Sequence, residues 1–158
     1  MTTAKRNFKV TYATLSSPDP QLHVLFDEAV ARARASLGQT YPMFIDGEEV
    51  WADETFTNRS PVDRDLVMGH YQNGTEEHVN RAVAAARRAF KEWSRLPWQE
   101  RVALMRKAAD IISERLFDIA AVMSLEVGKN RLESLGDVEE TADLIRYYAD
   151  QMEQNNGF

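Results

Sequence analysis

The sequence contains no cysteine among its 158 residues. This absence excludes thiolate nucleophiles, thiolate zinc sites, iron–sulfur clusters and disulfides from the chain, because each depends on a cysteine sulfur. Histidines are also few. They are His23, His70 and His78, and none lies three or four residues from another, the spacing that places two imidazoles on one helix face. We therefore expect no metal site.

Glycine is sparse and scattered, with seven in the chain and no G-x-G-x-x-G run. The sequence therefore predicts no dinucleotide-binding turn of the usual kind. Gly128-Lys129 does not form a phosphate-binding loop either. That loop needs a second glycine five residues earlier and a Ser or Thr after the lysine, where Met123 and Asn130 stand. We predict no cofactor-binding residue in this chain.

Long hydrophobic runs and excess positive charge are absent too. No window approaches the roughly 20 apolar residues of a membrane helix, and residues 1–9 lack the apolar segment of a secretion signal, so we expect a cytoplasmic protein without a membrane partner. The 19 Lys and Arg residues against 25 Asp and Glu residues give a net charge of -6. This balance argues against a nucleic-acid partner, because phosphate binding depends on clustered basic side chains.

The first of three parts, residues 1–40, contains a polar arm and a leading helix. Residues 1–17 show no sustained period, which indicates an extended arm. Asp19 is a suitable N-cap, Pro20 fits the first helical position and Gly38 ends the run. Apolar residues between them recur every three or four positions, which predicts an amphipathic helix.

Residues 41–74 form the second part and favour short strands. Asp46-Gly47 lies between Met43–Ile45 and Glu48–Trp51, which is a strong signal for a β-hairpin. Residues 56–58 and 66–68 predict two further strands, separated by turn residues. The apolar side chains of the hairpin need a partner surface, so we expect the isolated chain to be loose or oligomeric.

The third part, residues 75–158, has helical periodicity. Thr75 is a suitable N-cap for a helix over residues 75–94, Pro97 begins a second helix that continues to Val127, and Gly128 is a suitable C-cap. A further helix covers about residues 132–152, and its period favours antiparallel packing against the 97–127 helix. The first of these three helices has an apolar stripe that includes Val79, Val83, Phe90 and Trp93.

The last helix is rich in carboxylates, and Glu140 is the one that we single out. It lies two positions from each of the apolar residues Val138 and Ala142, at the shoulder of the apolar stripe. A carboxylate there is suited to meet a cationic ligand group. The alternative interpretation is that Glu140 belongs to a solvated helix face.

Several segments together resemble the N-terminal region of aldehyde dehydrogenases. The resemblance covers nearly the whole chain and depends on the order and spacing of these segments. They are Tyr41–Glu48, the turn Asn58–Pro61 leading into Leu66–Gly69, the helix end with Phe90 and Trp93, Pro97-Trp98 with Arg101, and Glu126–Asn130. The leading helix, Glu126–Asn130 and Asp143–Tyr148 are most similar to the L-glutamate γ-semialdehyde dehydrogenases, also called 1-pyrroline-5-carboxylate dehydrogenases.

This resemblance implies an α/β aldehyde dehydrogenase fold, of which the chain is the N-terminal portion, mostly helical with a small antiparallel hairpin region. It implies NAD as the cofactor of the complete enzyme, an aldehyde as its small-molecule substrate and a homo-oligomeric assembly. It also implies that Glu140 meets the α-ammonium group of the substrate, whose burial needs a charged partner.

Members of the family use a cysteine nucleophile, which this sequence lacks, so we expect the 158 residues alone to be inactive. We predict no catalytic residue within them. Two alternatives stay open. The chain is a fragment of an aldehyde dehydrogenase with another substrate, or it is a non-catalytic helical module that docks on a complete aldehyde dehydrogenase.

Overall fold

A computed structural model describes residues 10, 11 and 17–158. The extended arm expected over residues 1–17 lies almost wholly outside this described part, in which Val10 is buried. The elements of the described part are, in chain order, α2 (Pro20–Ser36), β1 (Thr40–Tyr41), β2 (Met43–Ile45), β3 (Glu48–Val50), β4 (Thr55–Arg59), β5 (Val67–Gln72), α3 (Glu76–Trp93), α4 (Trp98–Glu114), α5 (Leu116–Val127) and α6 (Arg131–Gln154).

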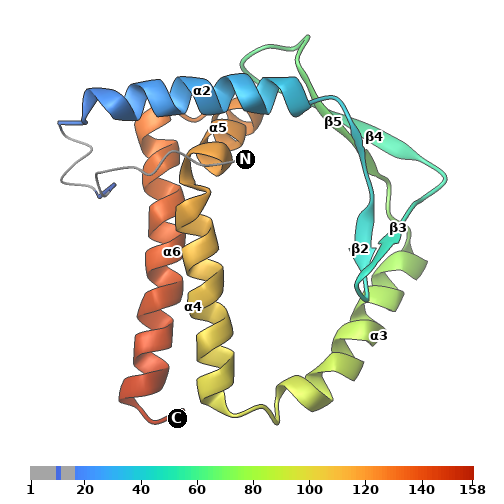
Figure 1. Ribbon diagram of the computed structural model, residues 1–158. Coiled ribbons are helices and arrows are strands. Elements are labelled where there is room, and N and C mark those ends of the chain that lie inside the picture. The colour runs from blue at the N-terminus through green and yellow to red at the C-terminus, as the bar shows by residue number, and fades with distance from the viewer. Residues whose placement is uncertain (1–9, 12–16) are drawn as a thin grey trace.

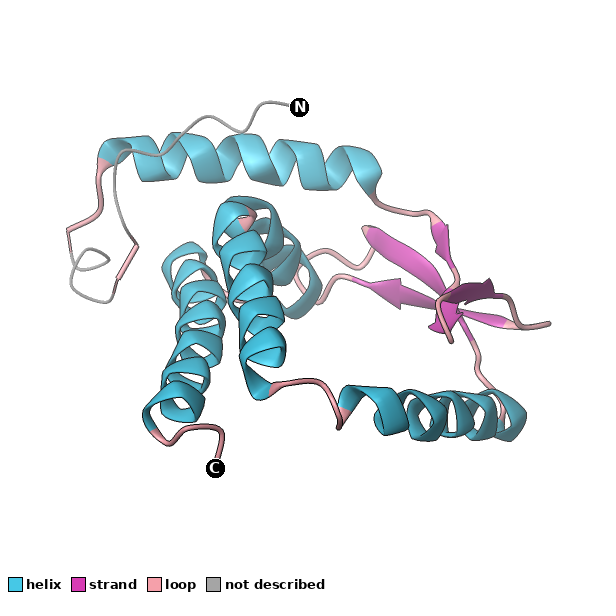
Figure 2. Cartoon of the chain, turned by 60° about the horizontal axis from the view of Figure 1, so that its bottom comes forward, coloured by secondary structure: helices cyan, strands magenta, loops and turns pink. Residues whose placement is uncertain are grey.

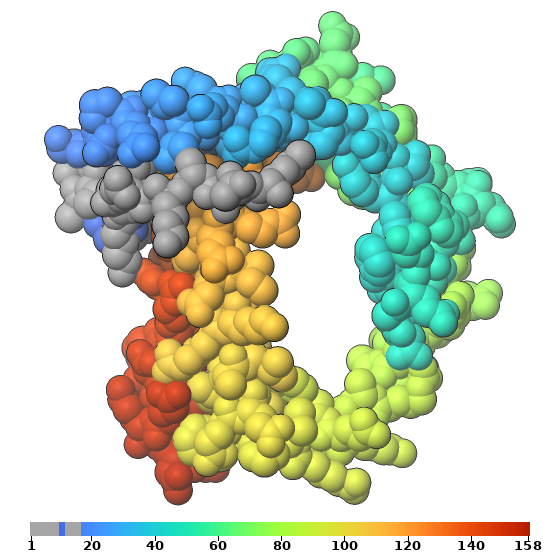
Figure 3. All heavy atoms as spheres, in the orientation of Figure 1, coloured from blue at the N-terminus to red at the C-terminus, as the bar shows by residue number. Residues whose placement is uncertain are grey.

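These elements surround an open centre (Figure 1). Helix α2 runs across the top of that view, with α4, α5 and α6 on one side and the strands on the other. Helix α3 connects the strands to α4 at the bottom. The same opening is visible between the atoms in Figure 3. Figure 2 shows that α3 stands apart from the group formed by the other helices. The chain therefore encloses its centre without filling it.

The helix ends follow the local signals in the sequence. Asp19 Oδ1 accepts a hydrogen bond of 2.8 Å from the Gln21 N–H at the start of α2. Asn130 Oδ1 accepts one of 3.0 Å from the Glu133 N–H at the start of α6. Gly128 caps α5 with a positive φ of 74°, a conformation that glycine adopts without a steric penalty. The predicted caps at Asp19 and Gly128 are confirmed.

The single helix expected over residues 97–127 was wrong, because the structure contains two helices there. Arg115 interrupts them with φ -95° and ψ 15°, outside the helical region. The chain has no proline or glycine at this point, so the break has no local sequence signal. Packing decides it: α4 lies along α6, whereas α5 also packs beneath α2. The third part of the chain consequently contains four helices.

The predicted hairpin is confirmed. Strands β2 and β3 are antiparallel with Met43 opposite Val50, and Asp46 and Gly47 turn the chain with φ of 59° and 82°. The predicted strands near residues 56–58 and 66–68 are β4 and β5, which pair antiparallel. Strand β1 was not predicted. It adds in parallel to the other edge of β5, with Thr40 opposite His70, and such a pairing of distant segments leaves no local signal.

Two apolar clusters form the core, both beneath α2. The first joins α2, α5 and α6 and consists of Val10, Leu22, Phe26, Leu116, Ala120, Leu135 and Val138. The second joins α2, α5 and the sheet and consists of Ala29, Ala33, Met68, Ala121 and Leu125. The antiparallel packing of α4 on α6, predicted from the helix period, is also present (Figure 1). The core therefore fixes α6 between two supporting helices.

Helix α3 does not contribute to either cluster. Its buried residue is Ala85, and the element that it packs against among the described residues is β2. The side chains of its predicted apolar stripe are exposed, as are Phe44 and Trp51 of the hairpin region. The amphipathic pattern was predicted correctly, but the part of the chain that the structure describes supplies no cover for its apolar side.

Candidate functional site

A polar network that includes the buried Glu139 joins α4 to α6. This side chain is only 5% exposed. The Ser113 hydroxyl on α4 donates a hydrogen bond of 3.0 Å to Glu139 Oε2. A buried carboxylate needs such donors, because removal from water otherwise disfavours its charge. Glu139 therefore fixes the rotation of α6 against α4.

Arg146 extends the network about two turns further along α6. Its guanidinium donates to Ser113 Oγ at 3.1 Å, to Asp110 at 3.0 Å and to Asp143 at 3.2 Å. Burial lowers the pKa of Arg146, but the hydrogen bonds to Asp110 and Asp143 outweigh it, so the pKa is raised. The guanidinium stays charged and links two turns of α6 to α4.

The predicted site residue Glu140 follows Glu139 directly and is exposed. One residue turns a helix by about 100°, so two neighbouring carboxylates face different surroundings. Glu139 is four residues from Leu135 and three from Ala142, on the buried stripe itself, whereas Glu140 lies beside it. Sequence reasoning missed the buried role of Glu139, although this spacing was the signal for it.

Glu140 begins an exposed strip on α6 that also contains Leu144, Tyr147 and Tyr148, at four, seven and eight residues from it. These spacings place the four residues along one side of the helix. The two tyrosine rings meet edge to face with their centroids 5.4 Å apart. The strip thus has a carboxylate at one end and two aromatic rings about two turns away, and both kinds of group attract cations. We call these four residues the α6 strip.

Two segments that are distant in the sequence meet at the C-terminal end of α5. The Asn58 amide donates to Glu126 Oε1 at 2.9 Å, and the buried Ser60 hydroxyl donates to the Leu125 carbonyl at 2.5 Å. Tyr71 lies near this junction. Burial first, and then the negative charge of Glu126, raises the pKa of Tyr71 above its ordinary value. The contacts hold the β part to the helices at a defined position.

We predict that Ser60→Ala lowers the free energy of unfolding by about 1 to 2 kcal/mol, because a buried acceptor and a donor lose their partner. The donor is the Val62 N–H, 3.2 Å from Ser60 Oγ. Ser94→Ala is the matched control, since Ser94 is exposed and should change stability by less than about 0.5 kcal/mol. Urea denaturation of both variants measures the difference, and equal midpoints would contradict the prediction.

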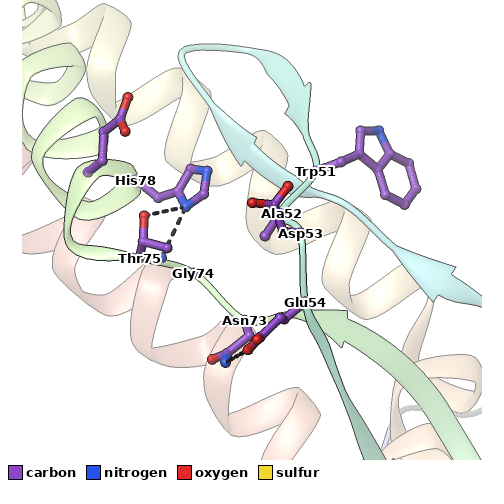
Figure 4. A pocket seen from close by; sticks show the side chains of 9 residues that line it. Trp51, Ala52, Asp53, Glu54, Asn73, Gly74, Thr75 and His78 are labelled. Atoms are coloured by element: carbon purple, nitrogen blue, oxygen red, sulfur yellow. Dashed lines mark hydrogen bonds between the residues drawn. The ribbon is translucent and has the colours of Figure 1, made fainter.

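A pocket lies between the hairpin region and the start of α3, lined by Trp51–Glu54, Asn73–Thr75, Glu77 and His78 (Figure 4). The Thr75 N–H donates to His78 Nδ1 at 3.0 Å, and Asn73 Nδ2 donates to Glu54 at 3.3 Å. Figure 4 shows the Trp51 ring turned away from His78. The first bond lies within the start of α3 and the second joins the residues that flank β4 and β5, so we interpret the pocket as the junction at which α3 follows the strands.

The three histidines have separate partners. His23 Nδ1 lies 3.0 Å from Arg131, His70 Nδ1 lies 3.0 Å from Thr57 Oγ1, and His78 caps α3. Within residues 10, 11 and 17–158, no group of three or more His, Asp or Glu side chains is arranged to hold a metal ion. In the same described ranges, none of the helices combines the length and apolar character needed to cross a bilayer.

Comparison with known proteins gives a consistent result. Residues 49–157 match the model of the aldehyde dehydrogenase family. The 1-pyrroline-5-carboxylate dehydrogenase of Oceanobacillus iheyensis is 31% identical over 127 residues, which are 80% of this chain and 25% of that protein. The chain thus spans about a quarter of the length of the curated relatives it matches.

Solved structures agree with the sequence comparison. A 1-pyrroline-5-carboxylate dehydrogenase from Thermus, with bound NAD, superposes with a TM-score of 0.82 at 31% identity, covering 94% of this chain and 28% of that one. An NAD-dependent aldehyde dehydrogenase from Sinorhizobium meliloti superposes with a TM-score of 0.69 at 35% identity, covering 85% of this chain and 25% of that one. The expected fold, the N-terminal portion of an aldehyde dehydrogenase, is confirmed.

Proposed function

The chain belongs to the aldehyde dehydrogenase family, and from this we propose that it is the N-terminal part of an NAD-dependent enzyme that oxidises L-glutamate γ-semialdehyde to L-glutamate, as in proline catabolism. The observation that carries the proposal is the superposition of 94% of the chain on a 1-pyrroline-5-carboxylate dehydrogenase with a TM-score of 0.82. The similarity to the Sinorhizobium meliloti enzyme makes another aldehyde the nearest alternative substrate.

Oxidation of an aldehyde requires a nucleophile that adds to its carbonyl carbon and an acceptor for the hydride. The family nucleophile is a cysteine, and this chain has none. NAD supplies the hydride acceptor in the complete enzyme, but this chain has no glycine-rich turn to bind it. We therefore propose that the 158 residues provide support and substrate contacts, while the chemistry takes place on other parts of the polypeptide.

Glu140 is the residue of this chain that we assign to the substrate. The α-ammonium group of glutamate semialdehyde is a cation that loses water when it binds, and a carboxylate offsets that loss. The tyrosines of the α6 strip add faces that attract a cation. Glu139 acts as a positioning residue, because its buried hydrogen bond to Ser113 fixes the side of α6 on which Glu140 projects.

We predict that the purified 158-residue chain forms no NADH from NAD and glutamate semialdehyde, whereas the native polypeptide from the source cells does. The native mass, with peptide mapping across Phe158, tests the first half of the proposal: a product much heavier than 18.0 kDa with a cysteine-containing peptide is expected. Aldehyde-dependent NADH formation by the short chain would contradict the assigned inactivity. A native product of 18.0 kDa would contradict the assignment to a larger enzyme.

The second candidate function is a non-catalytic module that docks on a complete aldehyde dehydrogenase. The exposed apolar side of α3 favours it, because such a surface associates with a partner. Co-purification of an 18.0 kDa product with a separate aldehyde dehydrogenase would select this function. For the first candidate we propose a homo-oligomer, as the sequence resemblance implies, and a cytoplasmic location, as the N-terminal sequence led us to expect.

A further inference from the structure

One arginine joins the start of α6 to the leading helix α2. Arg131 is the first residue of α6, and its guanidinium reaches α2, which crosses this end of the helix (Figure 1). Arg131 Nη2 pairs with Asp27 Oδ1 at 2.5 Å, and Nη1 lies 3.0 Å from His23 Nδ1. The guanidinium also lies 4.8 Å from the centre of the Phe26 ring. A single side chain therefore contacts α2 over one full turn.

Arg131 occupies a position in α6 that disfavours a cation. The N-terminal turn of a helix carries the positive end of its dipole, so a guanidinium there destabilises the helix. The Asp27 carboxylate and the Phe26 ring offset this cost, because both attract a cation. The Arg131 side chain is 31% exposed, so most of its surface is covered. We interpret Arg131 as a link between two helices and not as a helix-forming residue.

The link lies at the end of α6 that leads to Glu140. Leu135 and Val138, buried apolar residues on the next two turns of α6, belong to the same cluster as Phe26. Glu140 follows Val138 by two residues and is exposed. A rotation or tilt of these first turns changes the direction in which Glu140 projects, because side-chain directions are fixed relative to the helix axis. The contact with α2 therefore affects the geometry of Glu140.

We propose that Arg131 is a positioning residue for substrate recognition: by holding the start of α6 on α2, it sets the direction from which Glu140 meets the α-ammonium group of the aldehyde. This inference rests on the proposed function, in which Glu140 binds that group. The buried contact of Glu139 with Ser113 holds the same helix to α4. Helix α6 is thus fixed against two partners, and Arg131 supplies the polar contact with α2.

A second ion pair on α2 provides the matched control. Arg32 Nη2 pairs with Asp118 Oδ1 at 2.6 Å and joins α2 to α5 instead of α6. Its removal takes an ion pair of the same kind from α2 without touching the helix that carries Glu140. Arg131→Gln and Arg32→Gln therefore separate an effect on α6 from a general loss of support by α2.

The test uses the complete native enzyme with glutamate semialdehyde and with an aldehyde of similar length that lacks an ammonium group. Arg131→Gln should raise KM for glutamate semialdehyde about threefold to tenfold, because a displaced carboxylate binds the ammonium group less well. KM for the second aldehyde should stay unchanged. Arg131→Lys keeps a charge for Asp27 but loses the planar fork, so its KM should be intermediate. Arg32→Gln should leave both KM values unchanged, and circular dichroism verifies that each variant is folded.

A double variant shows whether Arg131 acts through Glu140. If it does, Arg131→Gln combined with Glu140→Gln should have the KM of Glu140→Gln alone, since no carboxylate remains to be positioned. Independent effects that multiply would overturn the inference. So would an equal rise of KM for both aldehydes, a rise of the same size in Arg32→Gln, or an unchanged KM in Arg131→Gln.

These outcomes are distinct from failure of the proposed function. If Glu140→Gln raises KM for glutamate semialdehyde and Arg131→Gln does not, the substrate contact stands and the positioning role is rejected. If neither variant changes KM, the assignment of Glu140 to the substrate is rejected as well. A native product of 18.0 kDa would reject the larger enzyme and the positioning role together.

Discussion

Replacing Leu135 by alanine is expected to lower the free energy of unfolding by about 2 to 5 kcal/mol. Leu135 is fully buried in the cluster that joins α2, α5 and α6. The substitution deletes apolar atoms that are buried away from water. It also leaves a cavity that the surrounding side chains fill only in part. Leu135 lies on α6, the helix that carries Glu140, and its side chain packs with residues of α2 and α5. The lost packing therefore weakens the support of α6 itself.

Leu104→Ala is the matched control for this prediction, since it makes the same chemical change on α4 at a side chain that is 50% exposed. It should cost less than about 1 kcal/mol. Thermal unfolding of the two variants gives the comparison, with the midpoint of Leu135→Ala lower by on the order of 10 °C. If both variants melted at the same temperature, the cluster beneath α2 would not be the stabilising core.

Glu140→Gln in the complete enzyme is expected to raise KM for glutamate semialdehyde about tenfold to a hundredfold, the loss of one charge-assisted hydrogen bond to the substrate ammonium group. The amide keeps the size of the side chain and removes only its charge. An aldehyde of similar length without an ammonium group should be oxidised equally well by both forms. Steady-state kinetics with the two substrates measures this difference.

Glu133→Gln is the control, because Glu133 is an exposed carboxylate near the start of the same helix. It changes the charge of α6 equally and should leave KM for both substrates unchanged. A loss of activity that is the same for both aldehydes would mean that Glu140 does not recognise the ammonium group. A KM for glutamate semialdehyde equal to that of the unsubstituted enzyme would lead to the same conclusion. Glu140 would then be a solvent-exposed carboxylate without a substrate contact.

Local signals were sufficient for most of the elements. Asp19 with Pro20 began α2, Asp46-Gly47 turned the hairpin, and Gly128 ended α5, because each residue acts on the backbone within one turn of its own position. The break at Arg115 and the parallel pairing of β1 with β5 were not predictable in this way. Both arise from contacts between segments that are far apart in the sequence.

The candidate site was also predictable from the sequence only in part. The acidic character of α6 and the shoulder position of Glu140 were evident from its spacing. The roles of the two neighbouring glutamates were not, because burial of Glu139 depends on Ser113 and Arg146 meeting between α4 and α6. A period of three or four residues locates the apolar side of a helix, but only the packed partner shows which polar residue at its edge is enclosed.

By itself, the sequence determined most of the helices and strands with their caps and turns, the lack of a cysteine nucleophile and the resemblance to aldehyde dehydrogenases. These are properties of residue type and short spacing. The tertiary structure decided that α6 is fixed by a buried carboxylate, that the Asn58 and Glu126 segments meet, and that α3 stands apart with its apolar stripe exposed. The reason is physical: burial is a property of the whole packed chain, and a helix pattern states which side is apolar without stating what covers it.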